Sequence, residues 1–164
     1  MSQNAIDRQN LTRFLSSAIS GNQKLADYLP EEEKARFEFL DLLDRKGLSC
    51  FFYGILQQST FKQERQKLSL ATLKRLTDTH KATLAKILGF KVEFVKLLNE
   101  LNNAGLEPMI LKGFHLAFWE YRDPGLRPIG DTDLLIRPEE LEEAHAVLHR
   151  LGYNSFHQTE KPDQ

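Results

Sequence analysis

The chain has 164 residues, of which 41% are hydrophobic and 27% charged, a composition typical of one globular domain with or without a helical extension. Its 22 Lys and Arg residues balance 23 Asp and Glu residues, and this lack of a basic excess argues against extended nucleic-acid binding. The single cysteine excludes an internal disulfide, and the polar N-terminus and the lack of an apolar stretch of about 20 residues predict a cytoplasmic protein without a membrane segment.

Residues 1–105 show helical patterns almost throughout and are interpreted as one helical region. Three glutamates after Pro30 mark the start of a helix whose apolar stripe continues to a C-terminal cap at Gly47. The apolar run LSCFFYGIL predicts a short buried helix, in which the cysteine is a small core residue rather than a nucleophile. Leucines at helical spacing over 62–103 predict either one long helix or a break near Thr77–Thr79.

After residue 105 the hydrophobic pattern changes, and residues 106–157 predict the order strand, helix, strand, helix, strand. The two complete strands are EPMILKG and DTDLLIR, and a third strand is expected to begin at Tyr153, after a helix that stops at Gly152. The predicted fold class is therefore α+β or α/β, with a helical N-terminal half and a small mixed sheet as an incomplete core. Residues 158–164 form a polar tail.

Asp131 and Asp133 stand at the start of the second predicted strand. Residues i and i+2 of a strand point to the same face, so the two carboxylates would project together, about 6–7 Å apart along the strand. Oxygen ligands of this kind suit Mg²⁺, with room for one ion or two, and leave coordination positions for substrate phosphates. The alternative is that both aspartates are solvated loop residues, because the pattern D-x-D is common.

The first predicted strand ends at Lys112 and Gly113 and continues directly into a helix. Free N–H groups at a helix N-terminus, with a lysine beside them, can bind phosphate, and a glycine lets the backbone approach closely. Arg127 is a candidate bidentate donor to phosphate oxygens, and a loop salt bridge with Asp123 is the alternative. A phosphate site and a metal site on adjacent strands could together hold Mg²⁺ and a nucleoside triphosphate.

The histidines are weaker candidates. His145 and His149 have the spacing of metal ligands on a helix, but no glutamate stands beside His145, and solvent-facing or core-edge positions are expected. His115 is either a substrate contact or a packing residue. The aromatic residues of the helix after Gly113 are expected in the core: Phe114, Phe118 and Trp119.

The segment LKGFHLAFWEYRDPGLRPIGDTDLLI, extended over residues 109–153, resembles the uncharacterised nucleotidyltransferase family of bacteria. That family is part of the DNA polymerase beta-like nucleotidyltransferase superfamily, in which a glycine-containing turn at a helix N-terminus is followed by an acidic pair on the next strand. The helical N-terminal half is also similar to the leading region of this family. The positions that carry the resemblance are Lys112, Gly113, Tyr121, Asp123, Pro124, Gly125, Arg127, Gly130, Asp131 and Asp133.

This resemblance implies transfer of a nucleoside monophosphate from a nucleoside triphosphate to a hydroxyl group, with Mg²⁺ as cofactor. Asp131 and Asp133 would be the catalytic metal ligands, while the acceptor could be a small molecule, a protein side chain or an RNA end. The superfamily also supplies a third carboxylate from a later strand. After the start of the third predicted strand at Tyr153, the only acidic residues are Glu160 and Asp163, so a shortened form is expected, and a non-catalytic binding or interaction module of the same fold is the alternative.

Overall fold

The computed structural model describes residues 12–13, 16, 30 and 32–154, which fall into two compact units. The first unit takes its residues from 1–87 and 117–128, and the second from 88–116 and 129–164. Within the described residues, no helix is both long enough and apolar enough to cross a membrane. The predicted division at residues 105 and 157 stays a prediction, and the tail 158–164 lies outside the described residues.

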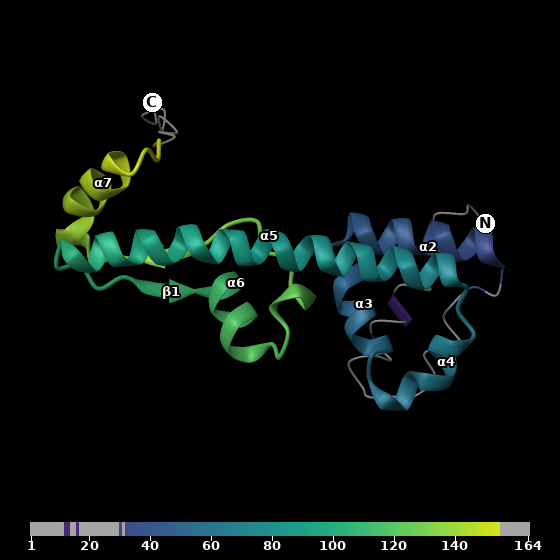
Figure 1. Ribbon diagram of the computed structural model, residues 1–164. Helices are drawn as coiled ribbons and strands as arrows, with labels where there is room; N and C mark the ends of the chain where they lie inside the picture. Colours follow the sequence, from purple (N-terminus) through teal and green to yellow (C-terminus); the bar gives the residue numbers. More distant parts are fainter. Residues whose placement is uncertain (1–11, 14–15, 17–29, 31, 155–164) are drawn as a thin grey trace, which may run out of the picture. The chain divides into compact units, whose positions relative to one another are not determined.

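The first unit consists of helices that bury one apolar face each. Apolar residues three and four positions apart share a face of a helix, which is how α2 and α3 contribute Phe39, Leu43 and Phe52 to one core. Gly47, with φ +67°, ends α2 as predicted. The helical segments of this unit are shown in Figure 1: α2 (Glu33–Arg45), α3 (Ser49–Leu56), η2 (Ser59–Phe61), α4 (Lys62–Gln66), the first part of α5 (Leu70–Asn103) and η4 (Pro124–Leu126).

Cys50 is a core residue of α3, which confirms the interpretation from sequence. Its side chain is 2% exposed, and its thiol donates to the hydroxyl of Thr83 over 3.3 Å. Burial disfavours the thiolate and raises the pKa of Cys50. Because the thiolate is the reactive form, this cysteine is a poor nucleophile at neutral pH.

The long helix α5 is continuous over 34 residues, with no break at Thr77–Thr79, so the single-helix alternative is confirmed. It does not begin at Lys62, because a turn separates α4 from α5. The hydroxyl of Ser69 accepts a hydrogen bond from the N–H of Thr72 over 3.2 Å, and this N-terminal cap explains why the helix starts at Leu70.

The second unit contains a two-stranded antiparallel sheet, so the α+β class is confirmed at this level. The pairing of β1 (Met109–Leu111) with β2 (Asp133–Leu135) is antiparallel, whereas a mixed sheet would also need a parallel pair, which the described residues do not form. The expected third strand is not seen at Tyr153 and Asn154, and its continuation over 155–157 lies outside the described residues.

Helices cover this small sheet. Strand β1 leads directly into α6 (Lys112–His115), which continues as a π-helical turn over Leu116–Glu120 (Figure 1). The ring of Phe114 packs against Phe94 of α5, with 4.2 Å between the ring centroids, and both rings are buried. After η5 (Pro138–Glu140), α7 (Leu141–Arg150) buries Ala144 and Val147 and ends before Gly152, as predicted.

The aromatic residues after Gly113 do not all enter a core. Phe114 is 2% exposed, as expected, but Trp119 is 61% exposed and Phe118 only partly buried. The prediction of a core position is therefore wrong for Trp119. The π-helical turn adds a residue to the helical repeat, so positions inferred from a spacing of 3.6 residues no longer point where an α-helix would place them.

Candidate functional site

The pairing of β1 with β2 brings Lys112 and Asp133 together. Leu111, the last residue of β1, lies opposite Asp133, the first residue of β2, and Lys112 follows Leu111. The Nζ atom of Lys112 lies 3.2 Å from Oδ2 of Asp133. The two side chains are 73% and 42% exposed, so solvent weakens this ion pair and a ligand can reach both groups.

Lys112 also has an unusual backbone conformation. Its φ of +49° is the only positive value at a non-glycine residue in the described part of the chain. For an L-residue the left-handed conformation costs roughly 1–2 kcal/mol, and residues held in it are concentrated at functional sites. Close approach of the backbone to phosphate at Gly113, expected from the sequence, stays a prediction; the left-handed conformation at this turn is that of Lys112, and Gly113 does not have a positive φ.

Asp131 lies just before β2 rather than within it. The strand begins at Asp133 and is shorter than the predicted strand DTDLLIR, so the two aspartates do not both belong to the regular part of a strand. Asp131 is exposed, and it forms no ion pair or hydrogen bond with a described residue. No group of three or more His, Cys, Asp or Glu side chains in the described residues could hold a metal ion.

The Asp-Pro-Gly loop belongs to the first unit, where a histidine of α5 holds it. One carboxylate oxygen of Asp123 accepts a hydrogen bond from the N–H of Gly125 over 2.8 Å, which caps η4. The other lies 2.7 Å from Nε2 of His80, which stacks on Tyr53 with 4.5 Å between the ring centroids. Nothing in the sequence signalled His80, which precedes Asp123 by 43 positions.

Arg127 also belongs to the first unit, whereas Lys112, Asp131 and Asp133 belong to the second. It does not form the alternative salt bridge with Asp123. Its Nε atom is buried and has no hydrogen-bond partner among the described residues. Arg127 lines a cavity of about 300 Å³ together with Tyr121.

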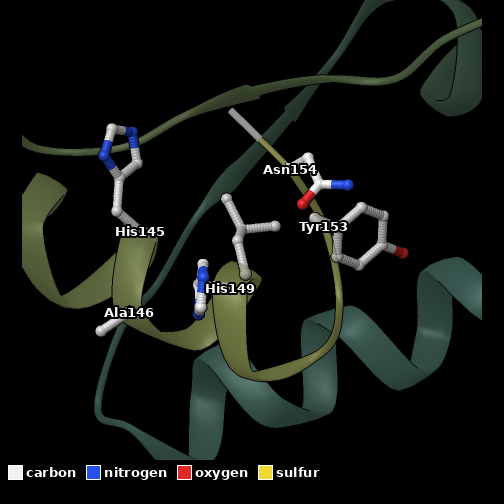
Figure 2. Close-up of a pocket in the computed structure, with 6 residues that line it drawn as sticks. His145, Ala146, His149, Tyr153 and Asn154 are labelled. Atoms are coloured by element: carbon white, nitrogen blue, oxygen red, sulfur yellow. The ribbon is translucent and has the colours of Figure 1, made fainter. Parts of the chain in front are cut away.

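The two histidines of α7 are exposed, as predicted. Figure 2 shows His145 and His149 projecting from the helix, with Tyr153 and Asn154 on the segment that follows it. These residues line a cavity of about 390 Å³. Two imidazoles without a third ligand among the described residues do not make a metal centre.

A second cavity of the second unit, of about 400 Å³, borders Asp131. Its walls come from the C-terminal part of α5, from β2 and the residues beside it, and from α7. Thr132 is among the lining residues, and its hydroxyl oxygen is buried without a hydrogen-bond partner in the described part of the chain. The sequence did not indicate this cavity, because its walls are far apart along the chain.

Residues 33–164 match the family described as uncharacterised nucleotidyltransferase. The chain belongs to this family. All five residues assigned to the site lie within the matched range, and so do His80 and Thr132. No curated protein matches the chain, and no solved structure matches it either. Membership supports a nucleotidyltransferase-type activity with a nucleotide as substrate.

Because Lys112 has a left-handed backbone conformation, we expect glycine to be more stable than alanine at this position, the reverse of the order inside a helix. Lys112→Gly and Lys112→Ala both remove the exposed ion pair, which contributes about 0–1 kcal/mol. Only glycine also relieves the backbone strain, so Lys112→Gly should be more stable than Lys112→Ala by about 1 kcal/mol. Chemical denaturation of the two variants measures this difference.

Lys74 provides the matched control, because it forms a similar exposed ion pair with Asp78 inside α5. In the interior of a helix glycine is less favourable than alanine by roughly 1 kcal/mol, so Lys74→Gly should be less stable than Lys74→Ala. The same order of stability at both positions would contradict a strained backbone at Lys112.

Proposed function

We propose that this protein transfers a nucleoside monophosphate from a nucleoside triphosphate to a hydroxyl acceptor, at the site where β1 ends and β2 begins. The observation that carries the proposal is the contact between Lys112 and Asp133, made in a chain of a nucleotidyltransferase family. It combines a cationic group suited to phosphate with an acidic group suited to a metal at one place on the sheet. Both groups are accessible to solvent, as a substrate site requires.

The residues fit Mg²⁺. This ion usually binds one or two carboxylates of a protein and completes its coordination with water and substrate phosphates. Asp131 and Asp133 offer two such carboxylates on either side of Thr132, and the ammonium of Lys112 already lies against one of them, so a positive charge is accommodated there. When bound, Mg²⁺ would neutralise phosphate charge and act as a Lewis acid.

Lys112 and Gly113 are the proposed phosphate ligands. In the free protein the ammonium of Lys112 pairs with Asp133, and a triphosphate offers it a more highly charged partner. We propose that Lys112 exchanges the carboxylate for the distal phosphates, which frees Asp133 to bind the metal. The N–H groups at the start of α6 would add donors beside Gly113. Arg127 of the first unit, whose Nε atom has no hydrogen-bond partner among the described residues, is proposed separately as an anion-binding residue.

A binding module without catalysis is the second candidate. It is favoured by one observation: the described residues contain two acidic groups at the site and no cluster of three that could hold a metal. The superfamily's third carboxylate would act as base toward the acceptor. Glu160 and Asp163, the acidic residues nearest the end of the sequence, lie outside the described residues.

Calorimetric titration with ATP, in the presence of Mg²⁺ and again with EDTA, separates these functions. An enzyme should bind ATP at least tenfold more tightly with Mg²⁺, and it should release pyrophosphate when acceptors are supplied. Binding that is indifferent to Mg²⁺ would support the non-catalytic module. Absence of ATP binding under both conditions would contradict the transferase and a nucleotide-binding module, and would leave only a module that interacts with another partner. Lys112→Ala should weaken binding of ATP more than of AMP, because the lysine is assigned to the distal phosphates.

A further inference from the structure

The cavity beside Asp131 has the size of a small-molecule site. Its volume of about 400 Å³ falls within the roughly 300–1,000 Å³ of ligand pockets. Most of its wall is apolar, including Phe94 of α5, Leu134 of β2 and Leu148 of α7. Five lining residues carry polar groups, and two of them, Asp131 and Thr132, are neighbours in sequence; the others are Glu93, His145 and Tyr153. Such a lining favours a ligand with an apolar body and a small number of polar groups.

The two faces of β2 serve different purposes. Leu134 of β2 and its flanking residues Thr132 and Ile136 line the cavity, whereas Asp133 does not line it and pairs with Lys112. Asp131 is the one carboxylate of the acidic pair that also lines the cavity. A molecule in the cavity would therefore have one end beside a proposed metal ligand.

The buried hydroxyl of Thr132 is a group that a ligand in the cavity could hydrogen-bond. A buried hydroxyl without a hydrogen-bond partner destabilises a folded protein, and its retention needs an explanation. Because Thr132 lines the cavity, rotation about its Cα–Cβ bond can present the hydroxyl to an occupant. An occupant that carries its own hydroxyl would satisfy this group and place that hydroxyl near Asp131.

The geometry points to this cavity as the acceptor site, and to an apolar small molecule with a hydroxyl group as the acceptor. The inference rests on the proposed function. A nucleoside fits less well, because the polar atoms of its base and ribose would lose water against mostly apolar walls. In the reaction, the acceptor oxygen forms a bond to the α-phosphorus of the triphosphate. The bond from that phosphorus to the bridging oxygen breaks, pyrophosphate leaves with the electron pair, and the hydroxyl proton passes to water.

The fluorescent alcohol 2-naphthol is a suitable probe. Its methyl ether, 2-methoxynaphthalene, lacks the hydroxyl proton and is the control ligand. The wild-type protein should bind 2-naphthol more tightly than the methyl ether. Thr132→Val keeps the shape of the side chain but removes its hydroxyl, so it should weaken 2-naphthol binding roughly fivefold, the loss expected for one hydrogen bond. The same substitution should raise the melting temperature, since an unsatisfied buried group disappears.

Leu148→Trp tests the cavity independently by filling it, and should reduce 2-naphthol binding at least tenfold. Leu151→Trp is the matched control, because Leu151 is 38% exposed and does not line the cavity. All three variants should keep the wild-type affinity for Mg²⁺-ATP. Unchanged binding of 2-naphthol in both Thr132→Val and Leu148→Trp would overturn the assignment of the cavity.

Transfer assays with labelled ATP test the acceptor class. Label should pass to 2-naphthol more readily than to glycerol, to a tyrosine-containing peptide or to an oligoribonucleotide. Preferred transfer to the peptide or the RNA would overturn the inference while leaving the proposed function intact. Conversely, binding of 2-naphthol that depends on Thr132, without any binding of Mg²⁺-ATP, would support the cavity as a ligand site and contradict the proposed function.

Discussion

Asp131→Asn and Asp133→Asn should each abolish the Mg²⁺-dependent part of ATP binding. Replacing a carboxylate by an amide removes the negative charge that a hard divalent cation requires. We expect the affinity for ATP in the presence of Mg²⁺ to fall at least tenfold, which corresponds to about 1.4 kcal/mol or more. Calorimetric titration of each variant with and without Mg²⁺ measures the effect directly.

The stability of these variants provides a second readout. Asp133 loses only an exposed ion pair with Lys112, so the free energy of unfolding should fall by no more than about 1 kcal/mol. Asp131 has no partner among the described residues, and its replacement should leave stability unchanged or slightly higher because a repulsion between carboxylates disappears. The matched control is Asp78→Asn, which breaks an exposed pair with Lys74 away from the site.

One combination of ATP binding and stability in the Asn variants would contradict a metal-binding role for the two aspartates. If both Asn variants bind Mg²⁺-ATP normally yet lose more stability than Asp78→Asn, the aspartates support the start of β2 and have no role in metal binding. The control variant Asp78→Asn must bind ATP with the same Mg²⁺ dependence as the wild type.

Gly125→Ala should destabilise the first unit by about 1–3 kcal/mol, as overpacking does in other proteins. A Cβ at this position would lie 2.8 Å from Nε2 of His80 and 2.9 Å from the Cβ of Leu84. The carboxylate of Asp123 binds both the N–H of Gly125 and the ring of His80. The loop therefore cannot move away from His80 without breaking these hydrogen bonds. Thermal and chemical denaturation would measure the loss.

Gly89→Ala is the control of opposite sign. Gly89 lies within α5, and an added Cβ would meet nothing within 4 Å. Alanine in the interior of a helix is more favourable than glycine by roughly 0.5–1 kcal/mol, so this variant should be more stable than the wild type. Equal effects of the two substitutions would show that the loop adapts to a side chain at residue 125.

These two positions show how far a residue type alone can be interpreted. Gly125 belongs to a turn sequence, Asp-Pro-Gly, and sequence reasoning explained it by turn chemistry. In the structure its small size is also required by His80, which is distant in sequence. Part of the resemblance to the family is therefore carried by residues that hold a loop in place. Asp123 is the clearest of these, because both of its carboxylate oxygens are used in packing the loop.

Local sequence was sufficient to predict the features that depend on neighbouring residues. The helical stripe of α2, the buried Cys50, the two short strands and the glycine that follows α7 all follow from local periodicity or from a single conformational preference. It also singled out Lys112, Asp131 and Asp133, because a turn between strand and helix and an acidic pair before a strand are readable in the order of residues.

Which side chains contact one another depends on the packing of elements that are distant in sequence. Periodicity tells which face of an element is buried, but not which element covers it. The contact between Lys112 and Asp133 depends on the antiparallel register of two strands, and that between His80 and Asp123 on the packing of a loop against a helix. The left-handed backbone at Lys112 and the hydroxyl of Thr132, which has no partner among the described residues, could not be predicted from sequence, because the chemistry of neither residue favours what the structure shows.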